Sequence, residues 1–307
     1  MKIFKTTILS IAFLASAVSF AQEAEESTEE ATTTLSVSGS IDTYFRSAEF
    51  APYTSFANLP GFALGMANIV LSYEGDKHGF VADFVYGPRG SEAVFNSTGS
   101  SNIVNQLYAY YNFSDSFTLT LGNFNTFLGY EVISPVANFN YSTSYMFSYG
   151  PFSHTGVKAD ITLSDNVSLM LAVLNQTDYT EGNFGGEDGT MFDSYMYGVQ
   201  LVLHGQYINL LAGDDYIQID FTGGVNLTDN FFLGVNATST DLAGDAGFSG
   251  IALYPQLALS ESFSIGLRRE VFRENDGGVA ALYSGELATS SEDADNTSFT
   301  ITGSYTN

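Results

Sequence analysis

A two-residue hydrophobic period runs through the chain after residue 34. In residues 35–42, apolar Leu35, Val37 and Ile41 fall on one face of an extended chain, and three serines with one aspartate fall on the other. The same alternation recurs at 107–113, 157–163 and 217–226. Because successive side chains of a strand point to opposite faces, the pattern predicts strands with one apolar and one polar side.

Short polar turns separate many of these runs. The triplets Ser-Asp-Ser, Ser-Asp-Asn, Thr-Asp-Asn and Ser-Glu-Ser favour tight turns, because short polar side chains bond the local backbone; they lie at 114–116, 164–166, 228–230 and 260–262. Two further turn signals are found at 74–79 and 204–206. Longer polar stretches lie at about 46–60, 87–102, 125–155, 176–194, 213–216, 239–249 and 274–296.

These tight turns and longer connections join fourteen predicted strands. We expect the strands at about 35–45, 61–73, 79–86, 103–113, 117–124, 156–163, 167–175, 195–204, 207–212, 217–227, 231–238, 250–259, 263–273 and 297–306. Short turns at one end and longer loops at the other are typical of outer-membrane barrels. The sequence therefore predicts an all-β fold, a closed antiparallel transmembrane β-barrel of about 14 strands over residues 35–307, with both termini periplasmic.

A membrane barrel differs from a soluble β-sandwich in where its apolar face points. In a sandwich the apolar faces of two sheets pack on each other. A membrane barrel turns its apolar rows toward lipid and closes on itself, because open strand edges would leave unpaired backbone groups in hydrocarbon. Aromatic residues beside the tight turns suit a girdle at the periplasmic interface, although ordinary hairpin packing also explains them; these are Phe113, Phe117, Phe231 and Phe263. The expected partners of the outer face are outer-membrane lipid and lipopolysaccharide.

The first 34 residues have the features of a secretion signal followed by a short leader. Lys2 and Lys5 precede a short apolar run at 8–20, and Ser19-Phe20-Ala21 supplies a cleavage site, so residues 1–21 are predicted to be a secretory signal peptide. Residues 22–34 hold five glutamates without an apolar period, which predicts an acidic disordered leader.

The central block resembles a known family. Residues 122–159 are similar to the OmpL-like putative β-barrel porin family of Gram-negative outer membranes, most specifically at Gly129-Tyr-Glu, Asn138-Phe-Asn-Tyr-Ser and Phe152-Ser-His-Thr-Gly156. The resemblance implies an outer-membrane porin and transfers no catalytic residue. One departure is the C-terminus, because the aromatic residue that the barrel assembly machinery commonly reads is here Tyr305, two residues before the end.

Alternate residues of each predicted strand face the interior of the barrel, and the charged ones among them are candidate pore-lining residues. Acids outnumber bases among these positions, which favours weak cation preference; they are Asp42, Arg46, Asp83, Lys158, Asp160, Asp220, Arg268 and Glu270. Charges of opposite sign on one strand offset each other, as in Lys158 with Asp160, Arg268 with Glu270 and Asp42 with Arg46. Asp83 and Asp220 are then the carboxylates without such a partner.

The connection at 125–155 is the longest and lacks alternation. A loop of that length usually has a function. We consider two arrangements, a segment folded inward that narrows the pore and an outer lid packed on its own aromatics. The candidate constriction residues are Glu131, Asn138, Asn140, Tyr141 and Tyr145.

Composition excludes several other functions. The chain has no cysteine, three histidines and 9 basic against 34 acidic residues, with a net charge of −25, so we expect no metal centre, no cofactor and no nucleic-acid partner. An acidic, glycine-rich stretch at 181–189 fits no calcium-loop pattern. No nucleophile–base set is visible, so an enzyme is not expected.

The sequence thus predicts a passive outer-membrane channel for small hydrophilic solutes. The alternative is a structural or adhesive outer-membrane barrel whose lumen is filled by side chains, without an open pore. Assembly into a homo-oligomer stays open. Ion conductance in a planar bilayer discriminates the two functions.

Overall fold

The computed structural model describes residues 34–49, 54–97, 99–180, 195–214, 216–242, 246–275 and 294–306. The predicted signal peptide (1–21) and the leader up to residue 33 lie outside these described residues. The acidic stretch at 181–189 lies outside them as well.

Fourteen antiparallel strands form one sheet, in which every strand pairs with its neighbours in the sequence. The strands are β1 (Thr34–Arg46), β2 (Gly61–Glu74), β3 (His78–Tyr86), β4 (Val104–Ser114), β5 (Phe117–Asn125), β6 (Ser153–Ser164), β7 (Val167–Leu174), β8 (Met196–Leu203), β9 (Gln206–Gly213), β10 (Tyr216–Thr228), β11 (Phe231–Leu242), β12 (Gly247–Ala258), β13 (Phe263–Asn275) and β14 (Ala294–Tyr305). The predicted all-β fold and strand count are confirmed.

Helical structure is confined to short pieces in the described part of the chain. These are α1 (Pro88–Ala93), the 3₁₀ turns η1 (Gly99–Ile103) and η2 (Pro135–Ala137), and α2 (Tyr145–Tyr149). None of the helices described here has the length and apolar character needed to cross a membrane.

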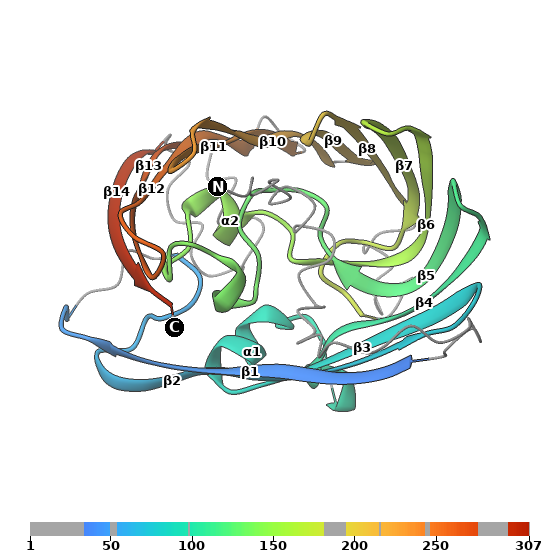
Figure 1. Cartoon of the computed structure of the whole chain (residues 1–307), viewed down its shortest axis with the longest axis horizontal. Helices are drawn as coiled ribbons and strands as arrows, with labels where there is room; N and C mark the ends of the chain where they lie inside the picture. Colours follow the sequence, from blue (N-terminus) through green and yellow to red (C-terminus); the bar gives the residue numbers. More distant parts are fainter. Residues whose placement is uncertain are drawn as a thin grey trace, which may run out of the picture.

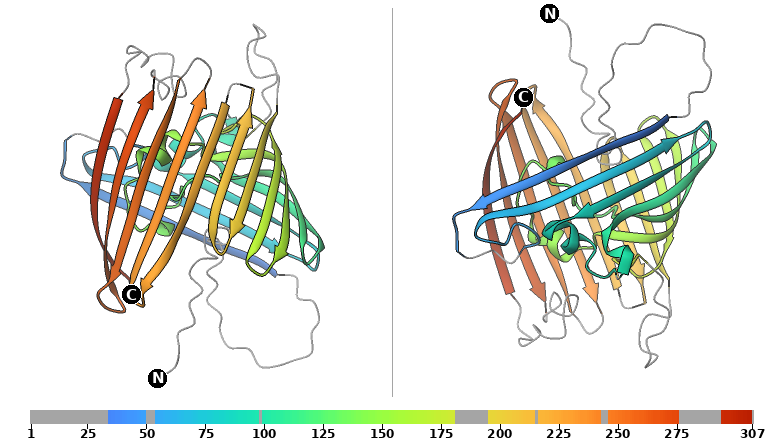
Figure 2. Two further views of the ribbon diagram at one scale, coloured as in Figure 1. Left: turned by 90° about the horizontal axis from the view of Figure 1, so that it is seen from above. Right: turned by 90° about the horizontal axis from the view of Figure 1, so that it is seen from below.

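The sheet curls round an interior that holds α1, α2 and the chain beside them (Figure 1). Strands β1 to β3 run obliquely to β10 to β14 on the opposite side, as the tilted strands of a barrel do (Figure 2). The start of β1 faces the end of β2 through the pair Thr34 and Glu74, and the end of β14 faces the start of β13 through Tyr305 and Phe263. The start of β1 and the end of β14 therefore both lie at the rim of the barrel that carries the tight turns.

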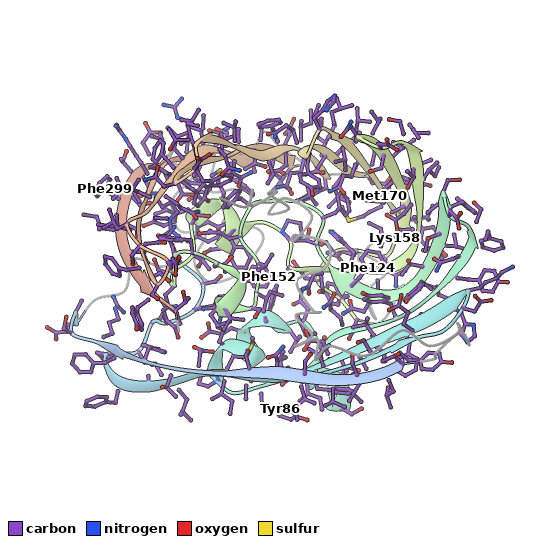
Figure 3. The ribbon with its side chains drawn as sticks, in the orientation of Figure 1. Tyr86, Phe124, Phe152, Lys158, Met170 and Phe299 are labelled. Atoms are coloured by element: carbon purple, nitrogen blue, oxygen red, sulfur yellow. The ribbon has the colours of Figure 1, made fainter. Side chains whose placement is uncertain are left out.

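The two faces of the sheet are inverted relative to those of a soluble protein. Apolar side chains such as Phe62, Ile41 and Phe299 are exposed on the outside, with 90%, 81% and 62% of their surface accessible. Asp220 and Glu270 are buried on the inside. Figure 3 shows Phe299 pointing away from the ribbon while Lys158 points inward. This inversion matches a barrel whose outer surface contacts lipid.

Strand ends differ from the predicted ones mainly where polar residues continue a strand. The predicted loop at 239–249 is wrong over most of its length, because β11 extends to Leu242 and β12 begins at Gly247. Thr240 belongs to the inner face and is buried. Since the inner face of such a sheet is polar, a polar run does not mark the end of a strand here.

The packed core lies inside the barrel. One cluster joins Phe56 and the α1 region to Phe147 and Phe152, and a second packs Phe127 and Leu128 against β7 to β9. A third packs Met146 against β12 and β13 through Phe248, Ala252, Tyr254 and Phe272. Each cluster includes residues from 126–152, so this segment and the inner wall form one packed unit.

Candidate functional site

Residues 126–152, called the inner segment below, connect β5 to β6 through the interior of the barrel (Figure 1). Its two ends leave the sheet side by side, because Asn125 pairs with Ser153. Phe152 lies well inside the ring of strands (Figure 3). The structure places this connection inside the barrel and not as a lid outside it.

Arg268 of β13 holds the middle of the inner segment. Its Nη1 lies 2.6 Å from Glu131 Oε1, and both side chains are almost fully buried. Its Nη2 donates to the carbonyl oxygen of Thr143 at 2.8 Å. The other oxygen of Glu131 accepts from the backbone N–H of Ser144 at 2.7 Å. The guanidinium of Arg268 therefore ties two stretches of the segment, around Glu131 and around Thr143, to one strand.

Two wall carboxylates bind backbone N–H groups of the same segment. Glu270 accepts from the N–H of Tyr145 and of Met146, each at 2.9 Å, at the start of α2. Asp220 of β10 accepts from the N–H of Gly129 at 3.0 Å. Buried carboxylates need such donors, because an unpartnered charge inside a protein is costly. The segment is consequently fixed to the wall by three charged side chains.

Contacts with β1, β14 and α1 hold further parts of the segment. The hydroxyl of Tyr141 donates to Asp42 Oδ2 of β1. The hydroxyl of Thr302 in β14 donates to Asn140 Oδ1 at 2.6 Å. Arg89 of α1 donates to the carbonyl oxygen of Ile133 at 2.9 Å and lies over the ring of Phe56.

Asp178 holds the end of the inner segment that leads into β6. Its Oδ1 accepts from the N–H of Phe152 at 2.6 Å and of Ser153 at 3.0 Å. Burial raises the pKa of Asp178 to about 7. This capping interaction and the role of Arg89 were not anticipated from the sequence, because both residues lie in stretches without a hydrophobic period.

Glycines of the wall make room for side chains of the inner segment. A Cβ at Gly234 would lie 2.5 Å from the Tyr130 hydroxyl oxygen, and one at Gly266 would lie 2.4 Å from the Phe139 ring. A Cβ at Gly198 would likewise lie 2.7 Å from the Phe127 ring, and one at Gly250 would lie 2.8 Å from the Met146 side chain. In sequence these positions look like weak points of strands. Their role is visible only once the segment is seen packed against the wall.

Replacing Gly234 with valine is expected to displace Tyr130 and lower the free energy of unfolding by about 1–3 kcal/mol, the usual cost of overpacking. The measurement is urea unfolding of the reconstituted protein. Gly303→Val is the control, because a Cβ there meets its nearest neighbours at 3.6 Å, an ordinary contact. Equal stability of the two variants would contradict the packing of Tyr130 on Gly234.

The structure places the eight candidate pore-lining residues on the inner face, most of them in polar contacts. Lys158 and Asp160 form an ion pair at 2.6 Å, and Arg46 donates to the carbonyl oxygen of Asn58. The expected offset of Arg268 by Glu270 is corrected, because the ion pair of Arg268 is with Glu131. The further pairings, of Asp42 with Tyr141 and of Glu270 with backbone N–H groups, are described above.

Asp83 and Asp220 are held by neutral donors. Asn105 Nδ2 donates to Asp83 at 2.7 Å, and Asn68 donates at 3.3 Å. Asp220 accepts from Asn209 at 2.8 Å and from Asn236 at 2.6 Å. Among the ion pairs of the described residues, neither carboxylate takes part.

The five candidate constriction residues fall into two groups. Glu131, Asn140, Tyr141 and the backbone of Tyr145 contact the wall, as described above. Asn138 instead closes a turn within the segment, because its side chain accepts from the N–H of Val132 at 2.9 Å and donates to the carbonyl oxygen of Val132 at 2.6 Å. Within the described ranges, no group of three histidine, aspartate or glutamate residues is arranged to hold a metal ion.

Several solved structures of outer-membrane proteins are distantly similar to this chain. OccK3 (OpdO) of Pseudomonas aeruginosa is 11% identical with a TM-score of 0.41, over 78% of this chain and 61% of that one. A BenF-like porin of Pseudomonas fluorescens Pf-5 is 14% identical with a TM-score of 0.45, over 89% and 77%. OmpT of Vibrio cholerae is 12% identical with a TM-score of 0.38, over 91% and 99%. The chain spans less than two thirds of the length of OccK3.

The sequence matches one family along the entire barrel. None of the curated proteins compared with the chain matches it. The family model described as "Putative beta-barrel porin-2, OmpL-like" matches residues 34–307. The chain therefore belongs to the OmpL-like β-barrel porin family and is a protein of the bacterial outer membrane.

Proposed function

We propose that the protein is a passive channel for small hydrophilic solutes, in which the inner segment sets the narrowest section. The observation that carries this proposal is the attachment of the segment to the polar wall by Arg268, Asp220 and Glu270. A segment held at fixed points across the lumen restricts passage to small solutes. The polar inner face supports solutes that keep their hydrogen bonds, and we assign the protein no catalytic step.

Single-channel recording in a planar bilayer tests this function. The full-length mature protein is expected to give discrete conductance steps in KCl. Insertion without conductance would favour the alternative, a structural or adhesive barrel with a filled lumen. The three interior clusters, which pack the inner segment against the wall, are the observation that supports that alternative.

We further propose a weak cation preference. The eight wall residues comprise five acids and three bases, and the inner segment with α1 adds two acids, Glu131 and Glu92, and one base, Arg89. A low-dielectric wall confines the field of the excess acids, so that they act on permeating ions more strongly than on an open surface. The preference should fade in high salt, because the Debye length falls from about 10 Å at 0.1 M to about 3 Å at 1 M.

The double substitution Asp83→Asn with Asp220→Asn is expected to move the reversal potential toward zero under a KCl gradient. It removes two charges that take part in no ion pair of the described residues. The matched control is Asp165→Asn with Asp229→Asn, which removes two exposed charges from tight turns. An anion preference in the wild type, or equal shifts in both double variants, would refute the proposal.

A further inference from the structure

A cavity of about 390 Å³ lies between the inner segment and strands β8 to β12. The segment contributes residues 126–132 and 137–140 to its lining, and the wall contributes side chains beside the tight turns that join β8 to β9 and β10 to β11. Its volume lies within the roughly 300–1,000 Å³ that is usual for small-molecule sites. The cavity is thus large enough for a small organic solute with a ring.

Aromatic rings around this cavity are held in place by the wall. Tyr130, Phe139 and Phe232 line it, and each ring lies against a glycine, since a Cβ at Gly234, Gly266 or Gly224 would approach that ring to 2.5, 2.4 or 2.2 Å. Tyr130 also stacks on Tyr254, with ring centroids 4.2 Å apart. The rings of Tyr130, Phe139 and Phe232 remain only half-buried. Fixed and partly accessible rings form a preorganised apolar surface that a ligand can cover.

The polar part of the lining is rich in amides and nearly neutral. Asn226 and Gln256 come from the wall and Asn140 from the inner segment. The acid in the lining, Glu131, is neutralised by Arg268 and bonded to the N–H of Ser144. The described residues that line the cavity include no lysine or arginine. Burial raises the pKa of Tyr130 from its ordinary value near 10 to about 12, so its hydroxyl adds no charge to the lining.

We infer that this cavity is a binding site for an uncharged sugar, a mono- or disaccharide, that permeates the barrel. A sugar ring has an apolar C–H face that packs on aromatic rings and an edge of hydroxyls that both donate and accept. Amide side chains also do both, which pairs them with hydroxyls in either direction. A charged solute would lack a counter-charge here and would lose hydration without compensation. This inference rests on the proposed channel function only for the route by which the sugar arrives.

Equilibrium binding and channel block together test the site. Maltose is titrated into the detergent-solubilised full-length protein by calorimetry, and the same sugar is added to single channels in a bilayer. Binding heat and a concentration-dependent drop in current are expected. Phe232→Ala should weaken binding about tenfold, or about 1.4 kcal/mol, because it removes one of the rings on which the sugar packs. Gln256→Leu, which keeps the side-chain size and removes the amide, should weaken it as well.

The control is Phe231→Ala, whose side chain belongs to the opposite face of β11 and pairs with Leu257; its affinity should equal that of the wild type. Conducting channels that maltose neither binds nor blocks would overturn the sugar site and leave the channel function standing. Maltose binding without any conductance would retain the site and refute the channel. Glucuronate bound as tightly as maltose, or equal loss in Phe231→Ala and Phe232→Ala, would also overturn the inference.

Discussion

Replacing residues 126–152 with a two-residue Asn-Gly turn is expected to raise single-channel conductance several-fold. Asn125 and Ser153 are directly paired, so a two-residue turn can close β5 and β6 without moving either strand. The replacement removes the inner segment and leaves every strand pairing of the sheet in place. Conductance is the direct measurement, because it depends on the narrowest section of the lumen.

The same Asn-Gly turn placed at Asp229–Asn230, between β10 and β11, is the control. It changes a tight turn and removes nothing from the lumen, so conductance should stay at the wild-type value. A channel that conducts equally with and without the inner segment would show that the constriction lies elsewhere. The replacement should also abolish maltose binding, because residues 126–132 and 137–140 line the cavity.

The strands could be predicted because each one shows the two-residue alternation and is bounded by polar residues. Alternation and polar turns are local, so the fourteen strands could be placed from the sequence before any contact was known. Parity then assigned Asp220, Arg268 and Glu270 to the inner face, where they are buried. The polar stretch at 239–249 was misjudged, because the rule that polar runs end strands fails on the inner face of a barrel.

The contacts of the inner segment could not be predicted in the same way. Glu131 and Arg268 are separated by 137 positions in the sequence, and nothing local marks them as partners. Glu270 lies two residues from Arg268 and looked like its counter-charge, yet it binds N–H groups of α2. Gly234 and Gly266 are informative only through the rings that lie on them. Such features depend on the packing of a segment whose path has no periodic signal.

Arg268→Met is expected to lower the free energy of unfolding by about 3–5 kcal/mol, the usual cost of removing one partner of a buried ion pair. The substitution leaves the Glu131 carboxylate buried without its counter-charge and removes a donor from the carbonyl oxygen of Thr143. The middle of the inner segment should then detach from β13, and single-channel current should become noisier. Urea unfolding in lipid vesicles and channel recording are the two measurements.

Two further variants separate the ion pair from a general effect on β13. Arg269→Met changes the neighbouring arginine, which is exposed on the outer face, and should leave both stability and current noise unchanged. Arg268→Met combined with Glu131→Gln removes both charges, so part of the lost stability should return, and the coupling energy from this double-mutant cycle reports the pair itself. Because the pair is buried, its coupling should vary little between 0.1 and 1 M salt, unlike that of an exposed pair. Equal destabilisation by Arg268→Met and Arg269→Met would show that the ion pair does not hold the segment.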